Sequence, residues 1–277
     1  MGRKVAVVTG ANKGIGFAIV RGLCKRLGPA AVVFLTSRNE DRGRYAISQL
    51  NNEGLHPHYH QLDVTDPESV TRFRDYIQVY LGGIDILVNN AAIAFKQNSQ
   101  ESVGVQAEET LRVNYFSLVT TCEILFPILL KGARVINVSS SAGHLTNIPS
   151  LALRQKFQDR TLTIPQLSEL MQQYIEAAKQ GTQLEEWGNS SYAVSKVGVT
   201  AFSKVLQRML DSKDIKVNAV HPGYVDTDMS SHKGPLTIDE GAEAPLFLAL
   251  DAPDTVKGEY VWYNKKIVSW DGEKHYG

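Results

Sequence analysis

The stretch Lys4-Val-Ala-Val-Val-Thr-Gly-Ala-Asn-Lys-Gly-Ile-Gly16 decides the fold of this 277-residue chain. Residues 4–9 form a nearly continuous apolar run, which is typical of a strand buried on both faces. The turn that follows has the spacing G-x-x-x-G-x-G, and residues 17–27 then carry apolar side chains at helical spacing. A strand, a glycine-rich turn and a helix in this order predict a site where a dinucleotide pyrophosphate meets a helix N-terminus. Gly10 would allow a tight turn, Gly14 would let the phosphates approach the backbone, and Gly16 would let the helix pack closely on the sheet.

Further apolar runs and helical patterns alternate along the rest of the chain. The runs predict strands at residues 31–36, 59–63, 84–90, 133–139 and 215–220, with an edge strand at 259–268. Helical patterns cover residues 66–81, 108–130 and 192–210. This order is typical of βαβ units. We therefore predict an α/β fold, a Rossmann-like doubly wound parallel sheet of about seven strands with helices on both faces, in a single domain that spans residues 1–277.

The end of the second predicted strand bears on which dinucleotide would bind. An NAD site usually places an acid there, but this strand ends in Ser37-Arg38. Arg38 and Lys13, which lies within the glycine turn, are cations that could pair with a ribose 2′-phosphate. Ordinary surface charge is the alternative, and Glu40 and Asp41 lie close by. The pattern favours NADPH over NADH.

Tyr192 and Lys196 have the spacing Y-x-x-x-K, which places both side chains on one face of a helix. A free tyrosine has a pKa of ~10 and transfers protons poorly at neutral pH. A cation beside the phenol favours the phenolate and lowers its pKa. A pair of this kind also occurs by chance on solvated helix faces, so its meaning depends on the other motifs.

Several motifs occur together and in order: Thr9-Gly10-x-x-x-Gly14-x-Gly16, Asn89-Asn90-Ala91, Ser140, Tyr192-x-x-x-Lys196 and Pro222-Gly223. Together they resemble the short-chain dehydrogenase/reductase family over nearly the whole chain. Within that family, the phrases His60-Gln-Leu-Asp63 and Ile93-Ala-Phe-Lys96 are similar to those of the monomeric, NADPH-dependent carbonyl reductases. Ala92 departs from the family, which usually has glycine there, and Tyr224 replaces a frequent tryptophan.

The resemblance implies a role for particular residues. The implied catalytic set is Asn114, Ser140, Tyr192 and Lys196. Ser140 would bind the carbonyl oxygen, and Tyr192 would transfer the proton. Lys196 would lower the pKa of the phenol and bind the nicotinamide ribose, and Asn114 would hold a water. The implied coenzyme (NADPH/NADP+) site comprises Gly10, Asn12, Lys13, Gly14, Ile15, Gly16, Arg38, Asp63, Val64, Asn90, Tyr192, Lys196, Pro222, Gly223, Val225 and Thr227. The implied substrate site comprises Ser140, Tyr224 and Met229, with Phe95 at its rim.

These residues imply reduction of a ketone, quinone or aldehyde to an alcohol by hydride transfer from NADPH, with Tyr192 as the proton donor. The aromatic and thioether side chains near the pocket favour a small hydrophobic carbonyl substrate. Oxidation of a steroid or prostaglandin alcohol would use the same groups in reverse. A protein that senses NADPH without turning it over is a second alternative, which the intact catalytic set argues against.

The segment of about residues 144–189 is longer than the family resemblance requires. Ser140 and Tyr192 are separated by 51 residues, whereas many family members have about a dozen, and such a length calls for structure of its own. An amphipathic stripe at helical spacing predicts a helix: Leu167, Leu170, Met171, Tyr174, Ile175 and Ala178. We expect this helical insertion to cover the surface through which relatives oligomerise, which would make the protein a monomer. Docking of a partner on the stripe is the alternative.

Composition narrows the function further. The chain has 29 basic and 29 acidic residues and so no net charge, which argues against nucleic acid or an anionic membrane as a partner. Cys24 and Cys122 lie among apolar neighbours and are expected to be reduced. We see no signal peptide and no apolar run long enough to span a membrane, so we expect a cytoplasmic protein.

The histidines carry weaker signals. His56, His58 and His60 alternate and would share one face of a strand, but no cysteine or acid completes a zinc set, so we predict no metal site. His221 precedes Pro222 near the expected coenzyme, and we expect it to fill space rather than to act in catalysis.

Overall fold

A seven-stranded sheet forms the centre of the protein, in a computed structural model that describes residues 3–96 and 98–272. The strands are β1 (Val5–Val8), β2 (Val32–Ser37), β3 (His58–Gln61), β4 (Ile84–Asn89), β5 (Leu129–Val138), β6 (Lys216–Val220) and β7 (Tyr260–Val261). Their order is β3-β2-β1-β4-β5-β6-β7, and every neighbouring pair is parallel. The predicted doubly wound sheet is confirmed. The order reverses between β1 and β4, so the crevice at the carboxyl ends of these two strands is where such a sheet binds ligands.

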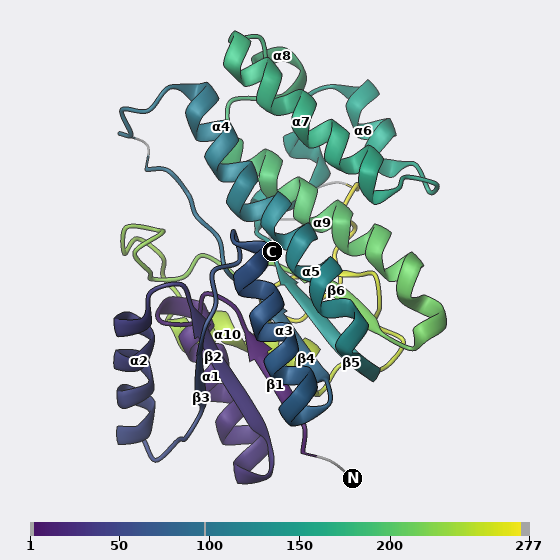
Figure 1. The fold of residues 1–277 in the computed structure, drawn as a ribbon. Coiled ribbons are helices and arrows are strands. Elements are labelled where there is room, and N and C mark those ends of the chain that lie inside the picture. Colours follow the sequence, from purple (N-terminus) through teal and green to yellow (C-terminus); the bar gives the residue numbers. More distant parts are fainter. Residues whose placement is uncertain (1–2, 97, 273–277) are drawn as a thin grey trace.

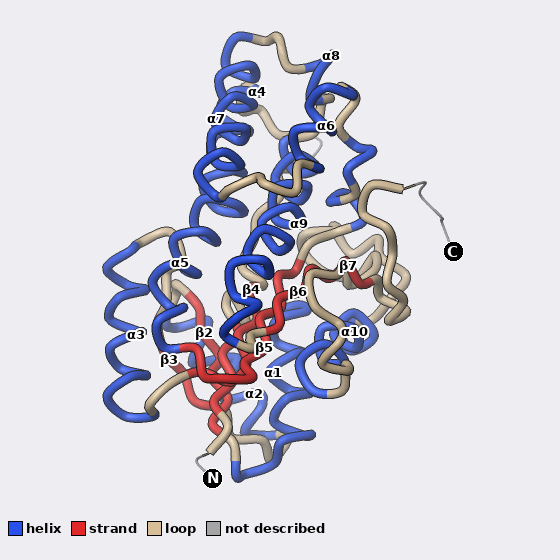
Figure 2. The backbone as a smooth tube through the Cα atoms, turned by 90° about the vertical axis from the view of Figure 1, so that its right-hand side faces the viewer, coloured by secondary structure: helices blue, strands red, loops and turns tan. Residues whose placement is uncertain are grey.

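Helices cover both faces of the sheet (Figures 1 and 2). One face is covered by α1 (Gly14–Leu27), α2 (Glu40–Asn52) and α10 (Ile238–Leu250). The other is covered by α3 (Pro67–Leu81), α4 (Val103–Leu111), α5 (Ser117–Leu125) and α9 (Ser191–Leu210). Short 3₁₀ turns lie at Gly28–Ala30, Phe126–Ile128, Ser141–Gly143, Leu145–Asn147 and Asp211–Lys213. Each face therefore has its own hydrophobic cluster, and the apolar central strands are shared between them.

The stretch that opens the sequence shows why the sheet is buried. All four residues of β1 are at most 1% exposed, as expected for a strand with helices on both sides. Their side chains alternate between the two clusters, with Val5 and Val7 on one face and Ala6 and Val8 on the other. This burial fixes the register of β1 and thereby the position of the glycine turn at its end.

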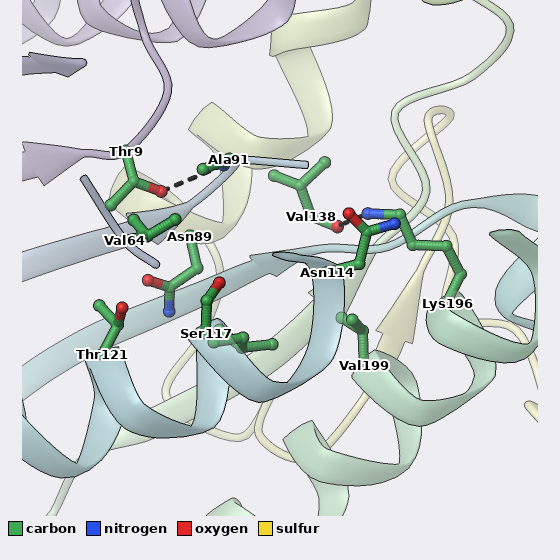
Figure 3. Close-up of a pocket in the computed structure, with 11 residues that line it drawn as sticks. Thr9, Val64, Asn89, Ala91, Asn114, Ser117, Thr121, Val138, Lys196 and Val199 are labelled. Atoms are coloured by element: carbon green, nitrogen blue, oxygen red, sulfur yellow. Dashed lines mark hydrogen bonds between the residues drawn. The ribbon is translucent and has the colours of Figure 1, made fainter. Parts of the chain in front are cut away.

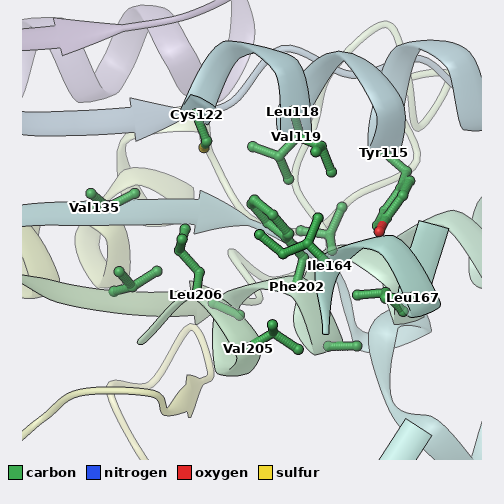
Figure 4. Packing of buried hydrophobic residues seen from close by; sticks show 14 of the residues in the cluster. Tyr115, Leu118, Val119, Cys122, Val135, Ile164, Leu167, Phe202, Val205 and Leu206 are labelled. Atoms are coloured by element: carbon green, nitrogen blue, oxygen red, sulfur yellow. The ribbon is translucent and has the colours of Figure 1, made fainter. Parts of the chain in front are cut away.

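The segment between Ser140 and Tyr192 forms a helical layer beyond α4 and α9 (Figure 1). It contains α6 (Leu151–Gln158), α7 (Ile164–Gln180) and α8 (Leu184–Trp187). A capping box between Thr163 and Gln166 starts α7, and Gly181 in the left-handed conformation ends it. All six residues of the predicted stripe are at most 5% exposed. Figure 4 shows Ile164 and Leu167 beside Phe202 of α9 and Leu118 of α5, so the stripe faces the core and does not offer a docking surface.

Three predicted elements differ clearly from the structure. The helix predicted for residues 108–130 ends at Leu125, because Pro127 lacks the N–H that would continue it. Leu129 and Leu130 already belong to β5, which was predicted to start at residue 133. The edge strand predicted for residues 259–268 contains only Tyr260 and Val261; the chain then turns at Lys265, which has a positive φ, and folds back.

Several helical elements were not assigned individually from the sequence. They include α2, α6, α8, α10 and one π-helical turn, Arg112–Phe116, that joins α4 to α5. The π turn contains Asn114, one of the residues expected at the catalytic site. Such turns occur often at functional sites because they re-aim a side chain within an otherwise regular helix.

Candidate active site

The glycine turn after β1 leaves the N-terminus of α1 open to an anion. No side chain caps α1, and its first turn contains no acidic residue, whereas α3, α7 and α10 are all capped by side chains. Gly14 has a φ of 59°, a conformation that favours glycine. The free N–H groups and the helix dipole together suit a phosphate.

The side chain of Asn90 binds the backbone at the start of the glycine turn. Its Nδ2 donates to the carbonyl oxygens of Thr9 and Gly10, both at 3.0 Å. A Cβ on Gly16 would lie 2.5 Å from the same Nδ2, so only glycine fits there without displacing this amide. The third glycine thus permits a contact that anchors the turn to β4.

Two cations lie near the ends of the first two strands. Arg38 directly follows β2, is exposed, and forms no ion pair with any residue that the structure describes. Lys13, at the start of α1, is also exposed, and its Nζ lies 2.5 Å from Oδ2 of Asp228. No acid occupies the end of β2, where Thr36 and Ser37 are buried. Arg38 is therefore available to pair with a 2′-phosphate, whereas Lys13 would have to exchange Asp228 for it.

Asp63 and Val64, both predicted at the coenzyme site, follow β3. The Oδ1 atom of Asp63 accepts hydrogen bonds from the backbone N–H and the hydroxyl of Thr65, at 2.9 and 2.7 Å. Its carboxylate therefore shapes the turn. Val64 lines a small cavity that reaches towards Lys196.

Tyr192 and Ser140 lie together although they are far apart in sequence. Ser140 Oγ accepts a hydrogen bond from the N–H of Ala142 at 3.2 Å. Desolvation raises the pKa of Tyr192, and the nearby Ser140 hydroxyl opposes that rise. The protein's own groups thus keep the phenol protonated near neutral pH.

Lys196 is buried beside Tyr192, as the Y-x-x-x-K spacing predicts. Its Nζ lies 5.7 Å from the centre of the Tyr192 ring and donates to the carbonyl oxygen of Val138 at 2.8 Å. Burial lowers the pKa of Lys196 to about 8. Desolvation dominates the pKa of Tyr192 and raises it, so the predicted lowering of this pKa by Lys196 stays a prediction.

Asn114 projects from the π turn towards Lys196 (Figure 3). Its amide exchanges two hydrogen bonds with the backbone of Ile93 and donates to Ser195 Oγ at 3.0 Å. Asn114 and Lys196 both line a cavity of about 20 Å³. A volume of ~10–15 Å³ suffices for one water. The predicted water-holding site therefore has room and polar walls.

The loop after β6 carries the predicted substrate residues. Tyr224 and Met229 are 53% and 45% exposed, and Thr227 lies over Gly14. Val225 is instead buried against Gly241 of α10. Burial lowers the pKa of His221 to about 4, so this imidazole is neutral near neutral pH and fills the end of the strand beside Trp262.

The structure therefore brings together most of the residues that the sequence singled out. Asn114, Ser140, Tyr192 and Lys196 form one cluster, and the glycine turn lies at the adjacent strand end. The alternating histidines lie elsewhere: His58 and His60 stack on the rings of Phe34 and Phe73. Among the described residues, no group of three or more histidine, cysteine or acidic side chains is close enough to hold a metal ion.

Sequence patterns missed the C-terminal contribution to the cluster. Tyr260 donates from its hydroxyl to the carbonyl oxygen of Ser140, and Trp270 donates from Nε1 to that of Gly143. These residues lie more than a hundred positions from their partners and belong to no local motif. No signal in a single sequence could have paired them.

Comparisons with known proteins agree with this geometry. A family profile described as short chain dehydrogenase matches residues 4–152 and 177–235 and omits most of α6 and α7. The mouse proteins carbonyl reductase (NADPH) 1 and carbonyl reductase (NADPH) 3 (Mus musculus) are each 44% identical to the chain, over 97% and 96% of its length and 99% and 97% of theirs. Among solved structures, salutaridine reductase from Papaver somniferum superposes with a TM-score of 0.85 at 30% identity, covering 93% of this chain and 99% of that one.

In residues 3–96 and 98–272, no helix combines the length and the apolar character that crossing a membrane requires.

Proposed function

Because the chain belongs to the short-chain dehydrogenase family, we propose that it is an NADPH-dependent carbonyl reductase, which converts a ketone, quinone or aldehyde into an alcohol. The observation that carries this proposal is the cluster of Ser140, Tyr192 and Lys196 next to an open helix N-terminus. Relatives named for NADPH-dependent carbonyl reduction, similar over nearly their whole length, support the same activity.

The site fits a phosphorylated dinucleotide. The uncapped N-terminus of α1 would bind the pyrophosphate through backbone N–H groups. Lys13 and Arg38 would pair with the 2′-phosphate, and the lack of an acid after β2 removes a group that would repel it. When bound, the reduced coenzyme supplies the hydride.

Ser140 and Tyr192 would act on the carbonyl oxygen. The N–H of Ala142 occupies one lone pair of Ser140 Oγ, which leaves the hydroxyl proton free to point at the substrate oxygen. Tyr192 would donate its proton as negative charge develops on that oxygen. Because desolvation raises its pKa, the phenol retains this proton near neutral pH until a stronger base appears.

Lys196 and Asn114 would restore the proton. Lys196 lies close enough to the phenol to stabilise negative charge on it, and the polar cavity that it shares with Asn114 could hold a water that leads away from the site. Tyr224 and Met229 would contact the substrate, since they expose an aromatic ring and a thioether on the loop above the site.

The alternatives are less well supported. An alcohol dehydrogenase acting on steroids or prostaglandins would need Tyr192 as a base, and its raised pKa opposes that role. A binding protein without turnover has no need for Ser140, Tyr192 and Lys196 to lie together.

Consumption of reduced coenzyme with a panel of quinones, aromatic ketones and aldehydes tests the proposal. We expect turnover with NADPH and much weaker turnover with NADH. Tight NADPH binding without consumption across the panel would contradict the proposal and favour the sensor.

We further propose that the protein is a cytoplasmic monomer in which residues 1–277 form one domain. The two cysteines are unpaired, which suits a reducing compartment. The apolar stripe of α7 is buried within the chain, so the insertion would cover a surface otherwise available for assembly. Sedimentation at micromolar concentration should give a single species with the mass of one chain; a stable dimer or tetramer would refute the monomer.

A further inference from the structure

The catalytic Ser140 lies in a loop that has left the sheet. β5 ends at Val138, and Ser139 makes the last ladder bond, from its N–H to the carbonyl oxygen of Val220. Ser140 then adopts an extended conformation and caps the short turn Ser141–Gly143. Neighbouring strands therefore do not fix its peptide, although the direction of its Oγ depends on that peptide.

Donors from outside the ladder hold the carbonyl groups of this loop instead. The Ser140 oxygen accepts from the N–H of Gly143 at 2.8 Å and from the hydroxyl of Tyr260 at 2.5 Å. The oxygens of Ala142 and Gly143 accept from Asn147 Nδ2 at 2.7 Å and Trp270 Nε1 at 2.8 Å. Of these donors, only Tyr260 reaches the serine itself from another part of the fold.

Tyr260 is well placed to act as a rigid support. Its side chain is fully buried, and its backbone pairs with Ala219 of β6 in the sheet. The N–H of Val268 donates to the Tyr260 carbonyl oxygen, and the chain then leads to Trp270, which also bonds the backbone of Leu145. Burial raises the pKa of Tyr260, so its hydroxyl remains a donor throughout the pH range of an enzyme assay. β7 is only two residues long, yet the segment that it anchors is joined to the serine loop, residues 140–145, by four hydrogen bonds.

We propose that Tyr260 is a positioning residue for the carbonyl reduction: its hydroxyl holds the Ser140 peptide so that Ser140 Oγ points at the substrate oxygen. This inference rests on the proposed function of the site. Tyr260 does not touch substrate or coenzyme in this account, and its effect passes through Ser140. Donors to a developing oxyanion contribute about 10²–10³ in rate, and misplacement loses part of this.

The first test compares Tyr260→Phe with Tyr115→Phe. The control loses an equally buried hydroxyl, which bonds Ser168 on α7 at 3.1 Å, away from the serine loop. We expect Tyr260→Phe to lower kcat by about tenfold, with NADPH affinity within about twofold of the wild type. The isotope effect of NADPH deuterated at the transferred position should rise, because hydride transfer becomes slower. An unchanged kcat, or an equal loss in the control, would overturn the proposal.

A double-mutant cycle separates positioning from a general structural effect. In the Ser140→Ala background, Tyr260→Phe should change kcat by less than about twofold, since the group it positions is gone. The same tenfold loss in that background would show that Tyr260 does not act through Ser140 and would refute the positioning role. If Tyr260→Phe does not fold, Trp270→Phe, which removes the donor to Gly143, serves in the same cycle.

Amide hydrogen exchange gives a readout that does not depend on turnover. The N–H of Ala142 is bonded to Ser140 Oγ, so loosening of the serine should speed its exchange in Tyr260→Phe but not in Tyr115→Phe. Unchanged protection would contradict the proposal even if no substrate were found. Lack of turnover in the wild type, with exchange altered as expected, would instead count against the proposed function alone.

Discussion

Replacing Tyr192 by phenylalanine tests the chemistry most directly, because it removes one oxygen and keeps the ring. The hydroxyl is the proton donor in the proposed reaction, and general acids contribute about 10²–10⁴ in rate. We therefore expect kcat to fall by at least about a hundredfold, equivalent to ~2.7 kcal/mol in the activation barrier. The affinity for NADPH should change by less than about twofold, because the phosphate-binding turn and both cations lie on other elements.

The same change should have little effect on folding. The hydroxyl interacts only with the nearby Ser140 among the groups that affect its pKa, and even a buried hydrogen bond contributes only about 1 kcal/mol to the free energy of unfolding. Tyr174→Phe is a matched control, since it removes a hydroxyl bonded to Ser191 at 2.9 Å, next to the catalytic tyrosine. Single-turnover oxidation of bound NADPH measures the chemical step, and titration of the coenzyme fluorescence measures binding. Retention by Tyr192→Phe of more than about a tenth of the wild-type rate would refute the acid role.

Three other perturbations probe coenzyme choice, charge and packing. Arg38→Ala should weaken NADPH binding about tenfold and spare NADH, because only the phosphate partner is lost; equal loss for both coenzymes would contradict this. The pKa of Lys196 is lowered to about 8, so kcat for reduction should stay level below that pH and fall above it, because the ammonium loses its proton. A pH profile of kcat that stays flat up to the alkaline limit of stability would contradict this role of Lys196. Leu167→Ala, at a fully buried position, should lower the free energy of unfolding in urea by about 2–5 kcal/mol without changing kcat of the folded protein. Glu169 is exposed on the same helix, so Glu169→Ala should change the free energy of unfolding by less than about 0.5 kcal/mol.

Local chemistry made much of the fold predictable. The buried strands are rich in valine, isoleucine, leucine and alanine, and glycines mark the turn after β1. The stripe of α7 repeats at helical spacing, and each of its six residues is buried. Pro127 was a readable signal for the end of α5, because a proline cannot supply the helical N–H, and extending the helix past it was an error.

Other features depend on contacts that no local pattern records. The π turn around Asn114 follows from packing against Ile93 and Ser195, not from the propensities of its own residues. The shortness of β7 reflects the return of the chain after Lys265, where Val268 bonds back to Tyr260. The rise in the pKa of Tyr192 depends on how deeply the phenol is buried, whereas spacing alone places a cation nearby and suggests the opposite. Sequence spacing therefore predicts which groups lie together better than it predicts their electrostatics.

The electrostatics bear on the direction of the reaction. A phenol whose pKa is raised by desolvation keeps its proton near neutral pH, so little phenolate is present to remove a proton from an alcohol. The same phenol is a suitable acid for a developing alkoxide, which is a far stronger base than a phenolate. Lys196, with its pKa near 8, is still mostly charged at neutral pH and can stabilise the phenolate that remains after transfer. Each group is thus in the protonation state that reduction requires before the reaction begins. Oxidation would require the phenol to lose its proton first, which the protein's own groups oppose.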